Sequence, residues 1–466
     1  MQIALSTLSD VTSASASVSL DGAAIATRVT TDSRDVKPGD IFVALRGERF
    51  DGHRFVETAI EQGAIVAIVD TLVESSQPLP QLVVEDTLAA YQAIARWWRD
   101  ELGTTVIGIT GSVGKTTTKE LLAGVLGRHG TVLKTQKNYN NEIGVPKTLL
   151  DLTPEHDYAV VEMAMRGKGQ IAELARIAKP DVGVIVNVGT AHIGLLGSRE
   201  AIAQAKCELL AELPETSVAI LNADNALLME TAATVWSGRQ ISYGFDAGDR
   251  CGTLDGETLH LADPGGDRAF PLPLPGRHNA SNYLAAIAVA ESLGLDTAGL
   301  ADGLSIALPD GRAKRIELPD DVVLLDETYN AGLESMLAAI DLLAETPGKR
   351  RLAVLGTMKE LGDRAVEFHQ KVGEALAKRA AAGEFDGLFV VAEPELAAAL
   401  SEAFAATSMP CVTETEETDA ARSRVTEKLL AMLQPGDRVL LKASHSVALD
   451  RVVAVLCDRL AVSPSR

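Results

Sequence analysis

The sequence predicts an α/β protein of about three domains. Its 466 residues exceed what one ordinary core holds, since domains usually contain roughly 100–200 residues. Residues 104–126 read as a strand, a glycine-rich loop and a helix, which is typical of a nucleotide-binding α/β domain. After residue 312 strands alternate with helices over about 150 residues, which predicts a doubly wound, Rossmann-like unit. The predicted domains are residues 1–85, 86–312 and 313–466.

Composition and charge limit what the protein binds. The net charge of −21 makes nucleic acid a poor partner, because phosphate backbones are bound by clustered Lys and Arg. The amino terminus lacks the positive region of a signal peptide, and no apolar run approaches the ~20 residues of a membrane span. We therefore expect a soluble protein that binds no nucleic acid and has no membrane span. A monomer is the expected state, although neither charge nor composition determines it.

The cysteines indicate a reducing compartment. They are scattered, and no two of them have the Cys-x-x-Cys spacing of a metal or redox site. Such thiols are typical of a cytoplasmic protein. The four residues are Cys207, Cys251, Cys411 and Cys457.

The first domain is rich in predicted strands, at residues 41–45 and 64–69. Ser33, Arg34 and Asp51 lie on loops at strand ends, where ligands usually bind, so we take them as candidate substrate-binding residues. The alternative is structural: Asp32 and Asp51 form turns, and the arginines make a solvated rim. Composition alone favours neither interpretation. A helix predicted over residues 87–102 leads into the next domain.

The glycine-rich loop of the second domain predicts a phosphate site. Residues 104–109 are apolar and β-branched, which indicates a buried strand, and leucines recur at helical spacing after residue 120. Glycines allow backbone N–H groups to approach phosphate oxygens at the start of a helix. The strict G-x-x-x-x-G-K-[ST] pattern is not met, because its first glycine falls on Ile109. The candidate nucleotide-binding residues are Gly111, Ser112, Gly114, Lys115, Thr116 and Thr117.

Lys115 suits the outer phosphates of a nucleotide, and the Thr116 hydroxyl suits a Mg²⁺ ion. A glycine-rich turn with a solvated lysine is the alternative. The register of strand, loop and helix favours the phosphate loop. Asn140 and Asn141 lie in an amide-rich loop nearby; they either cap the following helix or face a ligand.

Two further strands end in candidate ligands. Glu162 follows a strand at residues 158–161, and His192 follows one at residues 182–188. In open α/β sheets ligands bind outside the carboxyl ends of strands, so both side chains should share the edge that carries Thr116. Lys206 lies on the next predicted helix, which Ser198 caps. Composition alone makes Lys206 a solvated helix lysine.

An alanine-rich helix, opened by residues 274–282, ends the second domain, and either Asn279 or Ser281 is a candidate cap for it. The third domain has predicted strands at residues 322–325, 351–355, 388–391 and 438–441.

Read together, these motifs resemble those of the Mur ligase family, over nearly the whole chain. The Asn-Asn-x-Ile-Gly-Val-Pro and Tyr-Asn-Ala stretches are similar to those of the family members that add D-Ala-D-Ala. The matching segments are Asp32-Ser-Arg34, Gly39-Asp-Ile-Phe42, Asp51-Gly-His53, Thr110-Gly-Ser-Val-Gly-Lys-Thr-Thr117, Asn140-Asn-Glu-Ile-Gly-Val-Pro146, Asn187-Val-Gly-Thr-Ala-His192, Leu221-Asn-Ala-Asp224, Pro275-Gly-Arg-His-Asn279, Asp326-Glu-Thr-Tyr-Asn-Ala331, Ser335-Met336 and Val354-Leu-Gly-Thr-Met-Lys-Glu-Leu-Gly362.

The resemblance implies an ATP-dependent amide ligase of peptidoglycan precursor synthesis. Its three domains would bind the UDP-linked substrate, ATP and the incoming amino component. ATP would phosphorylate the terminal carboxylate of UDP-MurNAc-tripeptide, and the amine of D-Ala-D-Ala would then displace phosphate. The products would be UDP-MurNAc-pentapeptide, ADP and phosphate.

The resemblance also implies roles for single residues. Thr116 and Glu162 match a first magnesium site. His192 and Lys206 match a second, where the family lysine is carbamylated. With Lys115, Glu162, His192 and Lys206 are the expected catalytic residues.

At the nucleotide, His278 and Asn279 fall where adenine is held in the family. Arg312 matches an arginine that reaches the ATP phosphates, and Asp326 and Asn330 lie on a loop that faces ATP on domain closure.

The chain departs from the family pattern in three places. Thr357 stands where Asp is common, Ala164 where Gly is usual, and residues 442–445 read Lys-Ala-Ser-His instead of Lys-Gly-Ser-Arg near the amino-substrate site. Among other functions, a related amide ligase, such as the tripeptide synthetase or a folate polyglutamate ligase, shares the ATP motifs. A GTPase would need a guanine-reading Asn-Lys-x-Asp, which the sequence lacks. A nucleotide-sensing module would not need Glu162, His192 and Lys206 together.

Overall fold

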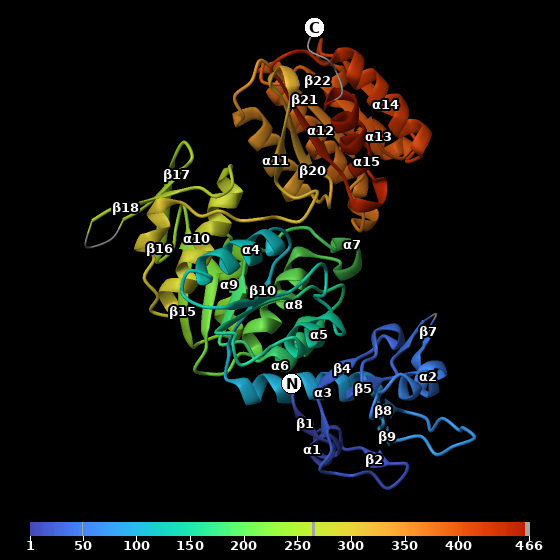
Figure 1. Cartoon of the computed structure of the whole chain (residues 1–466). Coiled ribbons are helices and arrows are strands. Elements are labelled where there is room, and N and C mark those ends of the chain that lie inside the picture. The colour runs from blue at the N-terminus through green and yellow to red at the C-terminus, as the bar shows by residue number, and fades with distance from the viewer. Residues whose placement is uncertain (49, 263–265, 462–466) are drawn as a thin grey trace.

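The computed structural model describes residues 1–48, 50–262 and 266–461. The chain forms three large sheets, each built from a consecutive part of the sequence. The amino-terminal and carboxy-terminal units lie at opposite ends of the central one (Figure 1). Every unit combines a largely parallel sheet with helices, which confirms the predicted α/β class.

The amino-terminal unit has a five-stranded sheet of order β2-β9-β8-β5-β4. Its two central strands are parallel and fully buried, as their run of apolar residues predicts. Its elements are β1 (Ile3–Ala4), α1 (Leu5–Thr12), β2 (Ser15–Ala16), β3 (Ile25–Ala26), β4 (Arg28–Thr30), β5 (Asp40–Val43), β6 (Arg46–Gly47), β7 (Phe50–Asp51), α2 (Val56–Glu61), β8 (Val66–Val69) and β9 (Gln81–Val83). Helix α3 (Thr87–Leu102) begins at the cap residue Asp86, whose carboxylate accepts from two backbone N–H groups, and leads to the central unit.

The central unit has a nine-stranded sheet of order β11-β12-β10-β13-β14-β15-β16-β17-β18, parallel as far as β16 and antiparallel beyond it. Its strands are β10 (Thr105–Thr110), β11 (Val132–Lys134), β12 (Tyr158–Glu162), β13 (Val182–Ile185), β14 (Val218–Asn222), β15 (Arg239–Gly244), β16 (Arg250–Asp255), β17 (Thr258–Leu261) and β18 (Arg268–Pro271). Its helices are α4 (Lys115–Leu126), α5 (Gly144–Leu150), α6 (Gln170–Ala178), α7 (Ile193–Leu196), α8 (Arg199–Ala211), α9 (Ala226–Val235) and α10 (Arg277–Ser292).

Two separate cores cover the faces of this sheet, because successive side chains of a strand point to opposite sides. Ile107 and Ile109 of β10 pack with α4 and α10 on one face. Val106 packs on the other face, with α5, α6, α8 and α9. Helix α4 is thereby held with its first residue at the carboxyl end of β10, where the glycine-rich loop joins them.

The carboxy-terminal unit has a six-stranded sheet of order β19-β20-β24-β21-β22-β23, parallel except for β19. Helices α11, α12 and α13 cover one face, and α14 and α15 cover the other. The elements are β19 (Lys314–Leu318), β20 (Val322–Glu327), α11 (Leu333–Glu345), β21 (Arg350–Gly356), α12 (Ala365–Ala381), β22 (Gly387–Val391), α13 (Pro394–Ala405), β23 (Cys411–Glu414), α14 (Asp419–Met432), β24 (Asp437–Lys442) and α15 (Asp450–Ala461).

One predicted strand is shorter than expected. The apolar run at residues 182–188 predicts a strand throughout, but β13 ends at Ile185. The pairing of β13 with β10 stops at Thr110 and Ile185, where β10 passes into the glycine-rich loop, and the Asn187 side chain bonds to that loop. Among the described residues no helix is both long and apolar enough to cross a membrane.

Candidate active site

The glycine-rich loop joins β10 to α4 at the carboxyl edge of the central sheet. Gly114 has φ +83°, and a Cβ there would lie 2.8 Å from Asn282 Oδ1, so both conformation and space require glycine. The backbone N–H groups of Ser112 and Val113 donate to Asn187 Oδ1 at 3.1 and 3.0 Å. Asn187 was not among the candidate site residues predicted from the sequence; the signal for it was a lone amide within an apolar run.

Lys115 extends back over this loop. Its ammonium donates to Gly111 O at 2.7 Å and Ser112 O at 3.4 Å. Burial lowers the pKa of Lys115, Glu162 opposes this effect, and the Arg312 guanidinium adds to it. The loop thus gathers backbone dipoles and a lysine at one point, which is an anion-binding arrangement.

Glu162 ends β12 directly beside α4, and its carboxylate is buried. Thr116 Oγ1 donates to Glu162 Oε2 at 2.9 Å, and Asn140 Nδ2 donates to Oε1 at 2.8 Å. The backbone N–H of Glu162 donates to Thr135 Oγ1 at 3.0 Å. The predicted meeting of Glu162 and Thr116 on one edge is confirmed, and Asn140 faces this pair instead of capping α5.

The side-chain amides of Asn141 and Asn279 both bond to backbone groups. Asn141 Oδ1 accepts from the N–H of Gly144, the first residue of α5, at 2.9 Å, but the residue at the cap position is Ile143, which makes no side-chain cap bond. The expectation that Asn279 or Ser281 caps α10 is wrong, because the helix begins after Gly276 without a side-chain cap. Asn279 lies within the helix and donates to Pro275 O at 2.7 Å.

His192 directly precedes α7, and Lys206 lies on α8. His192 has φ +65°, and its Nδ1 is 2.6 Å from Glu360 Oε2 of the carboxy-terminal unit. Burial lowers the pKa of His192, Glu360 opposes this effect, and the charges of Lys115 and Lys206 add to it. The interpretation of Lys206 as a solvated helix lysine is wrong, because its side chain is 2% exposed.

Burial, reinforced by the charge of Lys115, places the pKa of Lys206 well below its ordinary value. A fully buried ammonium is unfavourable unless it is paired. The fold therefore favours the neutral amine at this position.

Arg312 and Asn330 enter the site from the carboxy-terminal side. Arg312 lies over the ring of Tyr329, with 3.8 Å from the guanidinium carbon to the ring centroid. Lys442 Nζ donates to Asn330 O at 2.9 Å. Asp326, expected beside them, instead accepts hydrogen bonds from the backbone and hydroxyl of Thr328 at 3.1 and 2.6 Å.

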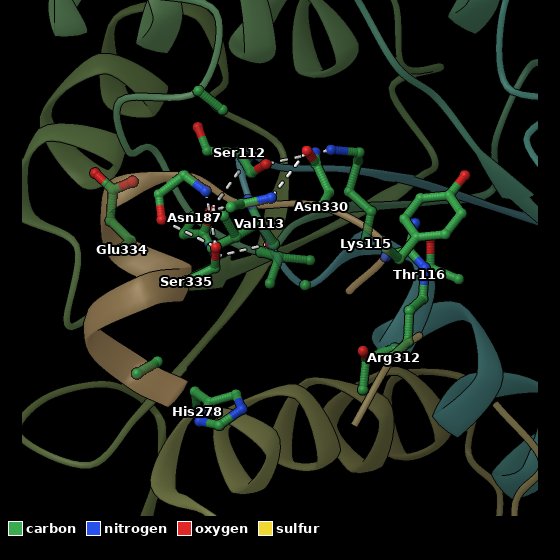
Figure 2. Close-up of a pocket in the computed structure, with 18 of the residues that line it drawn as sticks. Ser112, Val113, Lys115, Thr116, Asn187, His278, Arg312, Asn330, Glu334 and Ser335 are labelled. Atoms are coloured by element: carbon green, nitrogen blue, oxygen red, sulfur yellow. Dashed lines mark hydrogen bonds between the residues drawn. The ribbon is translucent and has the colours of Figure 1, made fainter. Parts of the chain in front are cut away.

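A cavity of about 1330 Å³ lies between the central and carboxy-terminal units, lined by residues of both. Figure 2 shows the loop residues, His278 and Arg312 arranged around it. Gly111, Lys206 and Asp326 are absent from its lining among the described residues. The expected residues that line it are Ser112, Gly114, Lys115, Thr116, Thr117, Asn140, Asn141, Glu162, His192, His278, Asn279, Arg312 and Asn330.

Ser33, Arg34 and Asp51 lie in the amino-terminal unit and are not among the described residues that line this cavity. Asp32 accepts hydrogen bonds from the backbone and side chain of Arg34, and Ser33 starts a short 3₁₀ turn. Asp51 likewise accepts from the backbone of His53 at 3.0 Å. The interpretation of both aspartates as turn formers is confirmed. The exposed Arg34–Asp32 pair contributes little to stability, so the guanidinium is free to exchange partners.

A phosphate loop on a parallel sheet, facing a Rossmann-like unit across a cavity lined by both basic and acidic side chains, defines a nucleotide-dependent α/β enzyme of several domains. The chain belongs to the Mur ligase family. The profile "Mur ligase family, catalytic domain" matches residues 26–96, "Mur ligase middle domain" matches 109–290, and "Mur ligase, glutamate ligase domain" matches 311–445.

Three relatives are similar over nearly the whole chain. The UDP-N-acetylmuramoyl-tripeptide–D-alanyl-D-alanine ligase of Synechocystis sp. is 59% identical over 430 residues, covering 92% of this chain and 91% of that protein. A crystal structure of MurF from Acinetobacter baumannii is 31% identical, with TM-score 0.88, covering 98% of this chain and 99% of that one. MurF from Thermotoga maritima in complex with ADP is 32% identical, with TM-score 0.81, covering 93% and 97%.

Proposed function

We propose that this protein joins D-Ala-D-Ala to UDP-MurNAc-tripeptide at the expense of ATP, giving UDP-MurNAc-pentapeptide, ADP and phosphate. The observation that carries the proposal is the phosphate loop with Lys115, Thr116 and Glu162 on the wall of a cavity that both the central and carboxy-terminal units line. The near-complete similarity to the Synechocystis ligase supports the same substrates.

Each domain has its own task in this proposal. Residues 1–85 bind the UDP end of the substrate, residues 86–312 bind ATP, and residues 313–466 present the amino substrate. The separation of the three sheets along the chain supports this division. Ser33, Arg34 and Asp51 contact the UDP-linked substrate at its nucleotide end, and Asn140 and Asn141 contact it beside Glu162.

The reaction proceeds in two balanced steps. An oxygen of the tripeptide carboxylate attacks the γ-phosphorus of ATP, and ADP leaves, so that a poor acyl donor becomes an acyl phosphate. The D-Ala-D-Ala amine nitrogen then attacks the acyl carbon, the bond from that carbon to the phosphate oxygen breaks, phosphate leaves, and the proton lost from nitrogen passes to solvent. Phosphoryl transfer depends on positioning and charge neutralisation, and the Lys115 ammonium on the loop supplies positive charge there.

Thr116 and Glu162 fit a Mg²⁺ ion, because both present oxygen and the buried carboxylate faces the phosphate loop. Mg²⁺ is usually held by one or two such groups together with substrate phosphates. When bound, Mg²⁺ neutralises charge on the transferring phosphate. His192 and a carbamylated Lys206 would hold a second ion. The modification needs an uncharged nucleophile, and the burial that lowers the pKa of Lys206 favours that form of its amine.

At the nucleotide, His278 and Asn279 hold adenine from the start of α10. Arg312 contacts the phosphates, and Asn330 faces ATP from the loop that Lys442 supports. Asp326 acts through this loop, by fixing the turn at Thr328. The proposal includes a monomer in the cytoplasm; the free cysteines are compatible with that reducing compartment.

Phosphate release by the purified protein tests the function. We expect ATP- and Mg²⁺-dependent release only when UDP-MurNAc-tripeptide and D-Ala-D-Ala are both present, with the pentapeptide product identified by mass spectrometry. N-acetylated D-Ala-D-Ala, which lacks the nucleophile, should give no ligated product, whereas D-Ala-D-lactate keeps the amine and should couple. Product formation from the acetylated dipeptide would refute amine attack.

The same assay separates the related ligases. Supplying the UDP-linked dipeptide with diaminopimelate or lysine tests the tripeptide synthetase, and supplying a folate with glutamate tests the polyglutamate ligase. Turnover with either pair, and none with D-Ala-D-Ala, would replace the proposed function.

A further inference from the structure

Among the described residues the Arg312 guanidinium has no acidic partner, although the protein is acidic. The net charge of the protein is −21. Even so, no carboxylate or carbonyl oxygen of the described residues pairs with Arg312, whose guanidinium makes a cation–π contact with the Tyr329 ring. Arg312 lines the cavity, and its charge lowers the pKa of Lys115 after the larger effect of burial. Its N–H donors are therefore available to an anion in the cavity.

Stacking on Tyr329 orients these donors. A guanidinium is planar and carries all its N–H groups at its edge, so a face laid on an aromatic ring leaves the edge free for phosphate. The distance of 3.8 Å from Cζ to the ring centroid corresponds to direct contact. An unstacked arginine at this half-buried position would sample many rotamers, each aiming its donors differently.

The backbone on both sides of Tyr329 is hydrogen-bonded, and His445 lies beside its ring. Its backbone N–H donates to Gly311 O at 2.9 Å, which ties the loop to the residue before Arg312. Gly311 has φ +72°, and a Cβ there would lie 2.9 Å from Tyr329 N, so glycine permits this close approach. The next carbonyl, Asn330 O, accepts from the buried Lys442, and His445 lies near the ring at 5.7 Å between centroids, with 29° between planes.

We propose that Tyr329 is a positioning residue, which holds the Arg312 guanidinium with its N–H edge toward the phosphate chain of ATP. Tyr329 acts through Arg312 and need not touch the nucleotide. The inference rests on the proposed function, because it assumes that ATP phosphates occupy the cavity. It extends that function by giving the half-buried aromatic ring of Tyr329 a part in phosphate recognition.

A double-mutant cycle tests this role. Tyr329→Leu should lower kcat/KM for ATP about tenfold, as expected for loss of a partly desolvated cation–π contact, and leave KM for D-Ala-D-Ala unchanged. Tyr329→Phe keeps the ring face and should stay within about twofold of the wild type. In an Arg312→Ala background, Tyr329→Leu should cause no further loss, because the group that it positions is gone. Equal losses in both backgrounds would overturn the proposal.

A second variant does not depend on Tyr329 tolerating replacement. Arg312→Lys keeps the charge and lacks the planar face, so it should lose about as much kcat/KM for ATP as Arg312→Ala; activity like that of the wild type would also overturn the proposal. Arg364→Ala is the matched control, since Arg364 stacks on Phe368 at 4.5 Å outside the cavity, and its activity should be unchanged. Wild-type protein without ligase activity would instead refute the proposed function, so the two failures are distinguishable.

Discussion

The carboxylate of Glu334 accepts two hydrogen bonds from Thr190, one from the backbone N–H at 2.8 Å and one from Oγ1 at 2.9 Å. Glu334 lies in the first turn of α11, whereas Thr190 follows β13, so this contact joins the carboxy-terminal unit to the central one. Gly189 makes room for it, because a Cβ there would lie 2.6 Å from Glu334 Cδ. The contact of His192 Nδ1 with Glu360 Oε2, at 2.6 Å, lies at the same interface.

Because the Glu334–Thr190 contact joins the two units, substitutions that disturb it should weaken domain closure. Glu334→Gln exchanges one acceptor oxygen for a donor, and Gly189→Ala places a methyl group against the carboxylate, so both should favour a more open protein. Wild type should become more compact in small-angle scattering when an ATP analogue and UDP-MurNAc-tripeptide are both bound, because closure excludes water from the acyl phosphate.

Both variants should compact less than the wild type at equal ligand saturation. The control is Glu374→Gln, which changes an exposed glutamate on α12 of the same unit. Compaction equal to that of wild type in both interface variants would show that Glu334 does not hold the closed state. A radius of gyration that never changes in the wild type would contradict closure itself.

Lys115→Ala should abolish ATP turnover while the fold is kept. The lysine places positive charge on the loop and belongs to no apolar core of the described residues, so we expect a loss of about 100-fold or more in kcat in a protein that still folds. Phosphate release and circular dichroism measure the two quantities. Lys378→Ala, an exposed lysine on α12, serves as the control. Near-normal turnover in folded Lys115→Ala would end the phosphate-loop interpretation.

Substitution of Lys206 tests whether its amine is carbamylated. Lys206→Ala should lose most activity, and small carboxylates should partly restore it by occupying the vacated oxygen positions. Lys206→Arg should be no better than Lys206→Ala, because the guanidinium cannot form a carbamate. Independently of activity, ¹³C-bicarbonate should give a carbamate NMR signal in the wild type that is missing from both variants. Full activity of Lys206→Arg would reject the modification.

Asp70 should make the stability of the amino-terminal unit pH-dependent. The Arg46 guanidinium bonds to both carboxylate oxygens at 2.8 Å and lowers the pKa of Asp70 from 3.8 to about 2. A carboxyl whose pKa falls on folding stabilises the fold above its ordinary pKa and loses that contribution as the pH falls toward the folded value. Asp70→Asn should therefore melt lower than wild type at pH 6, and the difference should shrink between pH 4 and 2. A difference that is constant with pH would contradict this account.

Local pattern was enough to predict the elements that place the phosphate loop. The apolar run before Gly111 and the leucines after residue 120 identify β10 and α4, because the periods of buried strands and helices differ. Helix α3 has the predicted bounds, because Asp86 and Gly103 mark its ends. The edge shared by Thr116 and Glu162 also followed from sequence, since parallel strands align their carboxyl ends.

The burial and the contacts of each candidate site residue depend on the tertiary structure alone. Lys206 has the composition of a solvated helix lysine, and only the packing of α8 against the central core shows it buried. Arg312, Tyr329 and His445 are distant in sequence, so no local period brings them into one stack. Asp326 and Glu327 are adjacent, yet only Glu327 lines the cavity, since neighbouring residues of a strand point to opposite faces. Sequence periodicity determines which residues share an element; burial and partners depend on contacts between elements, which that periodicity does not encode.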